Sequence, residues 1–260
     1  MTTTIAVAGK GGVGKTTVAA MVVKHLADTQ GPVLAIDADP SSNLNMVLGL
    51  DLESTIGDIR EGLLAQVGGR TSEGGGPGGG APVGIAKSEY LDYEIRSSLS
   101  EGMDFDLIAM GRPEGPGCYC AVNHTLRQVI DAISVNYRYV VVDNEAGMEH
   151  LSRRTTRDVQ HLLVVSDPTR RGIVAAGRIA ALRHELGVRI DQANLIVNRL
   201  RGEMPPELGE MIAQLDLPFL GTIPEVPEIW DQELTGRPLV ELDADSPLCT
   251  SVADLLGRIL

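Results

Sequence analysis

Cysteine is scarce in this chain of 260 residues, which contains only Cys118, Cys120 and Cys249. Three cysteines with this uneven spacing exclude a disulfide framework of the kind that holds small secreted domains together. In a reducing compartment, cysteines that lie close in sequence more often mark metal or redox chemistry. The pair at 118 and 120, which one residue separates, is therefore a candidate site.

Basic residues are scarce as well, with 22 Lys and Arg against 35 Asp and Glu and a net charge of −13. Phosphate backbones and anionic lipids are bound by basic surfaces, so this excess of acid opposes non-specific binding to either. No apolar stretch approaches the roughly 18 residues that span a bilayer, and the N-terminus leads directly into an expected strand without a signal-peptide pattern. We expect a cytoplasmic protein with no nucleic acid and no membrane among its partners.

Hydrophobic runs and helical periodicity alternate from end to end of the chain. Strands are expected at residues 4–8, 32–37, 107–110, 139–143, 159–166, 194–198 and 219–223, and helices at 13–27, 125–135, 173–186, 206–215 and 246–260. This alternation predicts one α/β domain, residues 1–260, in which helices cover both faces of a mostly parallel sheet. Ligands of such sheets bind at the carboxyl ends of the strands.

A Gly-rich segment at residues 68–84, which includes the run GGGPGGG, interrupts this alternation. The segment has almost no large apolar residue, so it cannot bury enough surface to offset the entropy cost of ordering. We expect a flexible insertion, which is either a mobile lid or a solvated loop with no role.

Residues 9–17 read GKGGVGKTT and lie between an expected strand and an expected helix. This is the context of a phosphate-binding loop, in which glycines let successive backbone N–H groups converge on phosphate oxygens. Lys15 is expected to reach the β- and γ-phosphates of ATP or ADP, and the Thr16 hydroxyl to hold Mg²⁺. A glycine-rich turn that binds nothing is the alternative. The expected nucleotide contacts are Gly11, Gly12, Val13, Gly14, Lys15, Thr16 and Thr17.

Acidic residues end two of the expected strands. Asp143 follows an apolar run, as the aspartate of a Walker B motif does, and is expected to hold Mg²⁺. Asp37 and Asp39 follow another strand, and Asp37 is expected to support the magnesium site. Acids also end strands for ordinary capping reasons, and either residue can form an Asx turn before Pro40.

A second lysine, Lys10, follows the first glycine of the loop and cannot easily serve the same phosphates as Lys15. KGGVGKT resembles the deviant Walker A loop of the MinD, ParA and nitrogenase iron-protein group of ATPases. The resemblance implies a homodimer that closes around two ATP molecules, with Lys10 crossing to the nucleotide of the partner subunit. In a closed, water-poor interface such a cation is far more effective than in water. A solvated loop lysine is the alternative.

The resemblance also assigns roles along the rest of the chain. It implies that Asp39 positions the attacking water and that Gly147 supplies a backbone N–H near the γ-phosphate. It further implies that Asn198 and the loop containing Pro224 contact adenine, although asparagine also ends strands routinely. With Lys10 and Lys15, Asp39 completes the expected catalytic set.

The Cys118 and Cys120 thiols face the same side if their segment is extended, and two chains would supply four thiolates. Four thiolates suit Zn²⁺, Ni²⁺ or an iron–sulfur cluster. Two buried free cysteines or a redox pair are the alternatives. Cys249 is expected to be structural, and His124 to lie on a helix surface.

Residues 115–120 read GPGCYC and, with Asp143 and residues 149–151, resemble the CooC-type ATPases that assist nickel insertion into carbon monoxide dehydrogenase. The resemblance extends to relatives that serve acetyl-CoA synthase. It implies that Cys118 and Cys120 bind Ni²⁺ or Zn²⁺ across a dimer and that the partner is a nickel–iron–sulfur client enzyme. A MinD/ParA-like positioning ATPase and an electron-transfer ATPase with an intersubunit [4Fe–4S] cluster are the rival interpretations.

Overall fold

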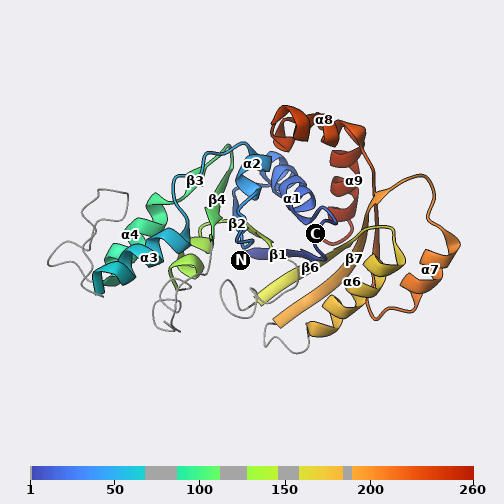
Figure 1. Ribbon diagram of the computed structural model, residues 1–260, viewed down its shortest axis with the longest axis horizontal. Coiled ribbons are helices and arrows are strands. Elements are labelled where there is room, and N and C mark those ends of the chain that lie inside the picture. Colours follow the sequence, from blue (N-terminus) through green and yellow to red (C-terminus); the bar gives the residue numbers. More distant parts are fainter. Residues whose placement is uncertain (1, 68–86, 112–127, 146–157, 184–188) are drawn as a thin grey trace.

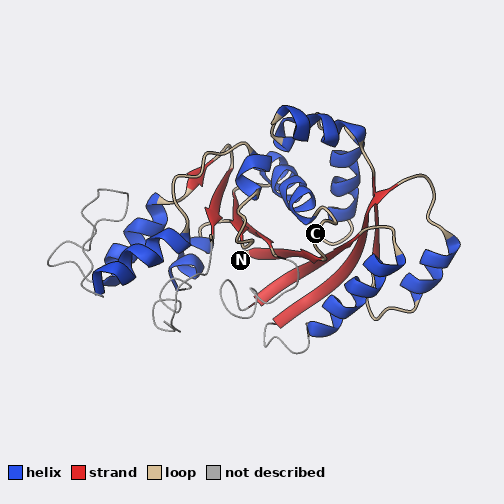
Figure 2. Cartoon of the chain, viewed as in Figure 1, coloured by secondary structure: helices blue, strands red, loops and turns tan. Residues whose placement is uncertain are grey.

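The computed structural model describes residues 2–67, 87–111, 128–145, 158–183 and 189–260, which form an eight-stranded sheet with helices on both faces (Figures 1 and 2). The strands run β3-β4-β2-β5-β1-β6-β7-β8, and every neighbouring pair is parallel except the antiparallel pair of β3 and β4. The strands are β1 (Thr3–Gly9), β2 (Val33–Asp37), β3 (Ser100–Glu101), β4 (Phe105–Ala109), β5 (Tyr139–Asp143), β6 (Asp158–Ser166), β7 (Arg189–Leu200) and β8 (Phe219–Pro224).

Helices connect the strands and divide between the two faces of the sheet. They are α1 (Lys15–Thr29), α2 (Leu44–Leu48), α3 (Ile56–Val67), α4 (Lys87–Ser97), α6 (Arg170–Leu182), α7 (Pro206–Ala213), α8 (Pro227–Thr235), the 3₁₀ turn η2 (Leu239–Glu241) and α9 (Pro247–Leu256), with a further helix at residues 128–134. None of the helices in the described part of the chain is long and apolar enough to cross a membrane.

Each central strand contributes side chains to two separate cores because successive residues of a strand point to opposite faces. Ala6 and Ala8 of β1 pack with α3, α4, α6 and α7, whereas Ile5 and Val7 pack with α1, α2 and α9. All five residues of β2 and of β5 are buried. Strands that are buried on both faces read as continuous apolar runs, which is why the sequence predicted them well.

The α/β fold with a mostly parallel sheet is confirmed, although several element bounds differ from those expected. Strand β7 begins at Arg189 rather than at residue 194, because its polar first half pairs with β6 in register. Helix α9 ends at Leu256 rather than at residue 260. The expected strands did not include β3, a two-residue strand that closes the edge of the sheet in the antiparallel direction. Residues 68–84 lie outside the described ranges.

Candidate functional site

The loop between β1 and α1 adopts a conformation that only glycine permits at several positions. Gly12 and Gly14 have φ of 81° and 86°, in the left-handed region that side chains rarely adopt. A Cβ on Gly9 would lie 2.4 Å from the Val165 carbonyl oxygen, and one on Gly14 would lie 2.5 Å from the Asn198 side-chain nitrogen. Left-handed residues within such a loop orient backbone N–H groups into an anion-binding concavity. The geometry therefore agrees with a phosphate-binding loop.

The two lysines of this loop lie in different surroundings. Lys15 opens α1 and is buried, with 8% of its surface exposed, and Thr17 is buried to the same extent. Lys10 is exposed at the opposite end of the loop. The positive end of α1 therefore lies at the loop, where Lys15 is enclosed. Lys10 is accessible from outside, as an interface lysine must be.

Strand register brings Asp37 and Asp143 together at the same edge of the sheet as the loop. Asp37 pairs with Asp143 between β2 and β5, and Asp143 also lies opposite Val7 of β1, two residues before Gly9. The sequence predicted both acids at strand ends. Their direct alignment follows from the strand order, in which β5 lies between β1 and β2.

Asp143 is a buried carboxylate whose oxygens make no hydrogen bond of ordinary geometry with the described residues, although the Thr16 hydroxyl lies close to it. It is 1% exposed. Burial raises the pKa of Asp143 to about 7, although the nearby Thr16 hydroxyl and Lys15 ammonium oppose the rise. Buried polar atoms are almost always paired, so an unpaired carboxylate beside a hydroxyl indicates a site for a cation. The donor set fits Mg²⁺, which prefers oxygen ligands.

Asp37 is buried as well, but its oxygens are engaged. It accepts hydrogen bonds from the backbone N–H of Asp39 at 3.0 Å and of Leu44 at 2.9 Å. Burial raises the pKa of Asp37 to about 6, and these two N–H groups oppose the rise. Asp37 therefore shapes the loop that leads from β2 to α2.

Asp39 is half-buried, and its Oδ1 accepts the Ser41 backbone N–H at 2.8 Å. This bond is the Asx turn that the sequence offered as the alternative for this position. It lies in the loop next to the Asp37 and Asp143 pair, so the residue expected to position water sits at the correct edge of the sheet. Its role with water stays a prediction.

Asn144 is a buried residue next to Asp143 that was not among the expected site residues, although it precedes the segment that holds Gly147. Its Nδ2 donates to the Val7 carbonyl oxygen at 3.0 Å and more weakly to the Val142 carbonyl oxygen at 3.4 Å. Its Oδ1 is buried and has no hydrogen-bond partner among the described residues. Asn144 ties the end of β5 to β1.

Asn198 lies at the end of β7 and contacts the phosphate-binding loop directly. Its Nδ2 donates to the Val13 carbonyl oxygen at 2.9 Å, and the side chain is 3% exposed. The next residue, Arg199, donates through NH1 to the Gly12 carbonyl oxygen at 3.1 Å. Pro224 ends β8 and pairs with Leu200 just beyond this point. The adenine contacts of Asn198 and Pro224 stay predictions.

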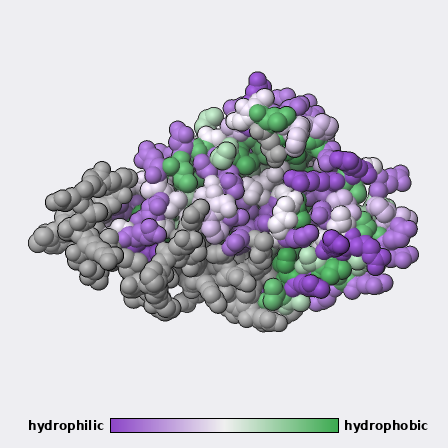
Figure 3. Space-filling model, in the orientation of Figure 1, coloured by the Kyte–Doolittle hydropathy of each residue, from purple (hydrophilic) through white to green (hydrophobic). Residues whose placement is uncertain are grey.

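A cleft of about 630 Å³ opens beside these residues. The residues that line it come from the end of β7 and the residue that follows it, from the segment between β8 and α8, and from the first half of α8. They are Arg199, Arg201, Glu225, Val226, Pro227, Ile229, Trp230 and Asp231. Figure 3 shows hydrophobic residues over α8 and also over α6, and the exposed Trp230 and Leu234 belong to α8. The cleft offers both charged and apolar contacts next to the phosphate-binding loop.

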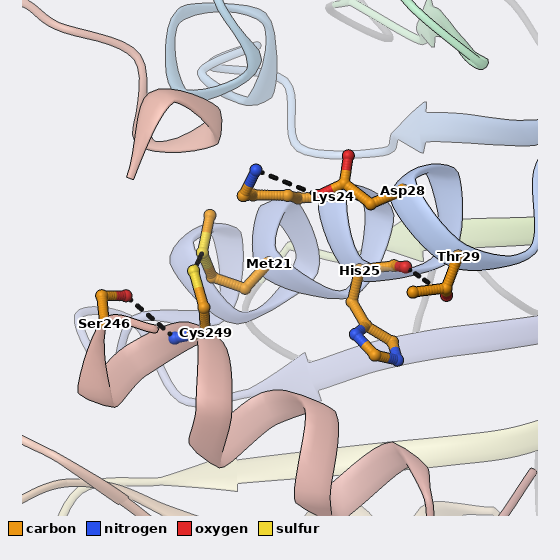
Figure 4. A network of polar contacts seen from close by, with 7 residues as sticks. All are labelled: Met21, Lys24, His25, Asp28, Thr29, Ser246 and Cys249. Atoms are coloured by element: carbon orange, nitrogen blue, oxygen red, sulfur yellow. Dashed lines mark hydrogen bonds and ion pairs between the residues drawn. The ribbon is translucent and has the colours of Figure 1, made fainter. Parts of the chain in front are cut away.

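Of the three cysteines, only Cys249 lies among the described residues. Cys249 is half-buried on α9, with its Sγ 3.9 Å from the Met21 sulfur of α1 (Figure 4). Its contact with α1 agrees with a structural role. Cys118, Cys120 and Gly147 lie outside the described residues. Within the described ranges, no group of three or more His, Cys, Asp and Glu side chains is arranged to hold a metal ion.

Comparison with known proteins relates the whole chain to nucleotide-binding proteins. A family model described as the CobQ/CobB/MinD/ParA nucleotide binding domain matches residues 4–239. The uncharacterized ATP-binding protein MJ0685 of Methanocaldococcus jannaschii is 40% identical, over 98% of this chain and 98% of that protein. The carbon monoxide dehydrogenase accessory protein CooC of Rhodospirillum rubrum is 29% identical, over 98% of this chain and 95% of its own. The MinD cell division protein of Aquifex aeolicus is 25% identical, with a TM-score of 0.67 over 98% of this chain and 95% of that chain.

Proposed function

This chain belongs to the CobQ/CobB/MinD/ParA family and is an ATP-binding ATPase, and we propose a more specific role for it. We propose that it is a homodimeric maturation factor for nickel enzymes. In this proposal, ATP binding and hydrolysis drive delivery of Ni²⁺ to the active-site cluster of a carbon monoxide dehydrogenase or acetyl-CoA synthase. Nickel is the cargo rather than a resident cofactor. A cytoplasmic location goes with the proposal, because the cysteines must stay reduced.

The observation that carries the proposal is the Cys118 and Cys120 pair. It occurs in a chain that is similar over almost its full length to a protein named as a carbon monoxide dehydrogenase accessory protein. Two thiolates from each of two chains would make a four-thiolate site, which suits Ni²⁺ or Zn²⁺.

The ATPase half of the proposal rests on the geometry of the loop and the acids. Lys15 would hold the β- and γ-phosphates, and Thr16 and Asp143 would hold Mg²⁺. When bound, Mg²⁺ would neutralise charge on the phosphates. Asp39 would orient the water that attacks the γ-phosphorus, which gives ADP and inorganic phosphate.

Closure of the dimer would couple ATP hydrolysis to nickel delivery. If Lys10 contacts the nucleotide of the partner subunit only in the closed state, ATP stabilises that state by a contact absent from the open one. Hydrolysis removes the γ-phosphate and with it this preference. The exposure of Lys10 supports this arrangement, because an exposed side chain is accessible to a partner subunit.

Changing both Cys118 and Cys120 to alanine is expected to remove one Ni²⁺ per dimer without changing ATP binding. Nickel would be counted by equilibrium dialysis followed by elemental analysis, with and without ATP. Cys249→Ala is the matched control, because this third cysteine packs against Met21 and should not bind nickel. Unchanged nickel content in the double variant would refute the metal site. A brown anaerobic preparation that contains iron and sulfide would favour the electron-transfer interpretation instead.

A further inference from the structure

Two adjacent residues at the end of β7 hold two consecutive carbonyl groups of the phosphate-binding loop. The Asn198 amide donates to the Val13 oxygen at 2.9 Å, and the Arg199 guanidinium donates to the Gly12 oxygen at 3.1 Å. These contacts join positions 185 and 187 residues apart in the sequence. They act on the backbone of the loop rather than on its side chains, so their effect is on the direction of its peptide groups.

The planar trans peptide fixes what these contacts do to the N–H groups. In a trans peptide the C=O of one residue points opposite to the N–H of the next. With the Gly12 and Val13 carbonyls held toward β7, the N–H groups of Val13 and Gly14 point away from β7. Backbone N–H groups of this motif cradle the phosphates, so phosphate is expected on the side to which these N–H groups point. The two side chains at the end of β7 therefore preset the donors that meet the phosphates.

The backbone at the end of β7 is itself held in an uncommon conformation. Arg199 has φ of 58°, in the left-handed region that is rare for a residue with a long side chain. The Asn198 Oδ1 accepts the Arg199 N–H at 2.9 Å, and the Leu200 carbonyl accepts the Glu225 N–H at 3.0 Å. These bonds keep the turn in place and aim the guanidinium at the loop. Such conformations persist only where the surroundings fix them.

Gly14 leaves no room for a side chain between the loop and these two residues. A Cβ on Gly14 would lie 2.5 Å from the Asn198 amide nitrogen and 3.6 Å from two nitrogens of Arg199. Gly14 thus lies directly against this pair of side chains. A larger residue at position 14 would displace the amide, so the glycine serves the contact as well as the left-handed turn.

We propose that Asn198 and Arg199 are positioning residues that clamp the phosphate-binding loop in its anion-binding conformation. The clamp acts on the phosphate half of the ligand. Loss of the clamp therefore weakens the binding of every nucleotide, whatever its base, and of inorganic triphosphate alike. If the two residues instead recognised adenine, their loss would weaken the binding of ATP and leave the binding of the other ligands unchanged.

Arg199→Gly and Asn198→Asp test the clamp. Glycine accepts φ of 58° without strain but lacks the donor, so Arg199→Gly should fold at least as stably and bind ATP, GTP and tripolyphosphate several-fold to about tenfold more weakly. Asn198→Asp places a carboxylate oxygen against the Val13 carbonyl and should weaken all three ligands by at least about tenfold. Arg199→Lys keeps one donor and should restore part of the affinity. Binding would be measured by calorimetry, and folding by thermal unfolding without ligand.

Two control variants test whether relief of backbone strain or loss of a positive charge, rather than loss of the clamp, changes ligand binding. Asp104→Gly relieves the same kind of left-handed backbone, with φ of 60°, on the connection between β3 and β4 and should leave binding unchanged. Arg189→Ala removes an equal charge from the other end of β7, where Arg189 pairs with Asp191. A loss confined to ATP in Asn198→Asp would overturn the clamp in favour of base reading. Unchanged tripolyphosphate binding in both clamp variants would overturn it as well.

Discussion

Replacing Lys10 by alanine is expected to lower the rate of ATP hydrolysis by about a thousandfold, while each subunit on its own still binds ATP. The expectation follows from the exposed position of Lys10, outside the loop interior where the buried Lys15 lies. A cation supplied across an interface acts on charge that develops in the transition state, so its loss lowers the rate more than the affinity. Phosphate release would measure turnover, and calorimetry would measure binding.

Two further lysines are the controls for this result. Lys15→Ala should lose ATP binding together with hydrolysis, because the ammonium is expected to contact the phosphates of its own subunit. Lys24→Ala, further along the same helix, removes a lysine that pairs with Asp28 away from the loop, and should leave both properties unchanged. Light scattering would show whether ATP still drives dimerisation. Retained ATP-driven dimerisation and turnover in Lys10→Ala would contradict its role across the interface.

Asp143→Asn is expected to stabilise the unliganded protein at pH 8 while it abolishes magnesium-dependent hydrolysis. Burial raises the Asp143 pKa to about 7, so the folded state favours the neutral acid. The stability from this group is fully present below pH about 4 and is lost as the pH rises through 7. At pH 8 the ionised carboxylate costs about 4 kcal/mol, and the buried amide that replaces it costs about 1–2 kcal/mol, which leaves a net gain of about 2 kcal/mol.

Urea unfolding at pH 5 and pH 8 without magnesium measures this effect. The variant should gain stability over the wild type mainly at pH 8, with little difference at pH 5. Asp28→Asn, which changes an exposed acid on α1, should shift the free energy of unfolding by no more than about 1 kcal/mol at either pH. Equal destabilisation of Asp143→Asn at both pH values would contradict the account of this carboxylate.

The parts of the site that the sequence predicted are those set by local pattern. The glycines of the loop, Lys15 and the strand-ending acids Asp37 and Asp143 lie where motif and hydrophobic alternation place them. Their chemistry follows from residue type and from the rule that parallel strands end at one edge.

The remaining features depend on contacts between distant segments. The burial of Asp143 and its alignment with Asp37 follow from the position of β5 between β1 and β2, which no local pattern encodes. The contacts of Asn198 and Arg199 with the loop require β7 to lie two strands from β1, with its end turned by a left-handed residue. The length of β7 was missed because its first half is polar and is held by pairing with β6 rather than by burial.

The affinity of the dimer for Ni²⁺, measured with and without a non-hydrolysable ATP analogue, tests the central claim most directly. If dimer closure forms the shared cysteine site, nickel and nucleotide must change each other's affinity by the same factor. We expect the analogue to change the nickel affinity of the wild type by about fivefold or more, and nickel to change the affinity for the analogue by an equal factor. Identical nickel affinities with and without the analogue would contradict the claim.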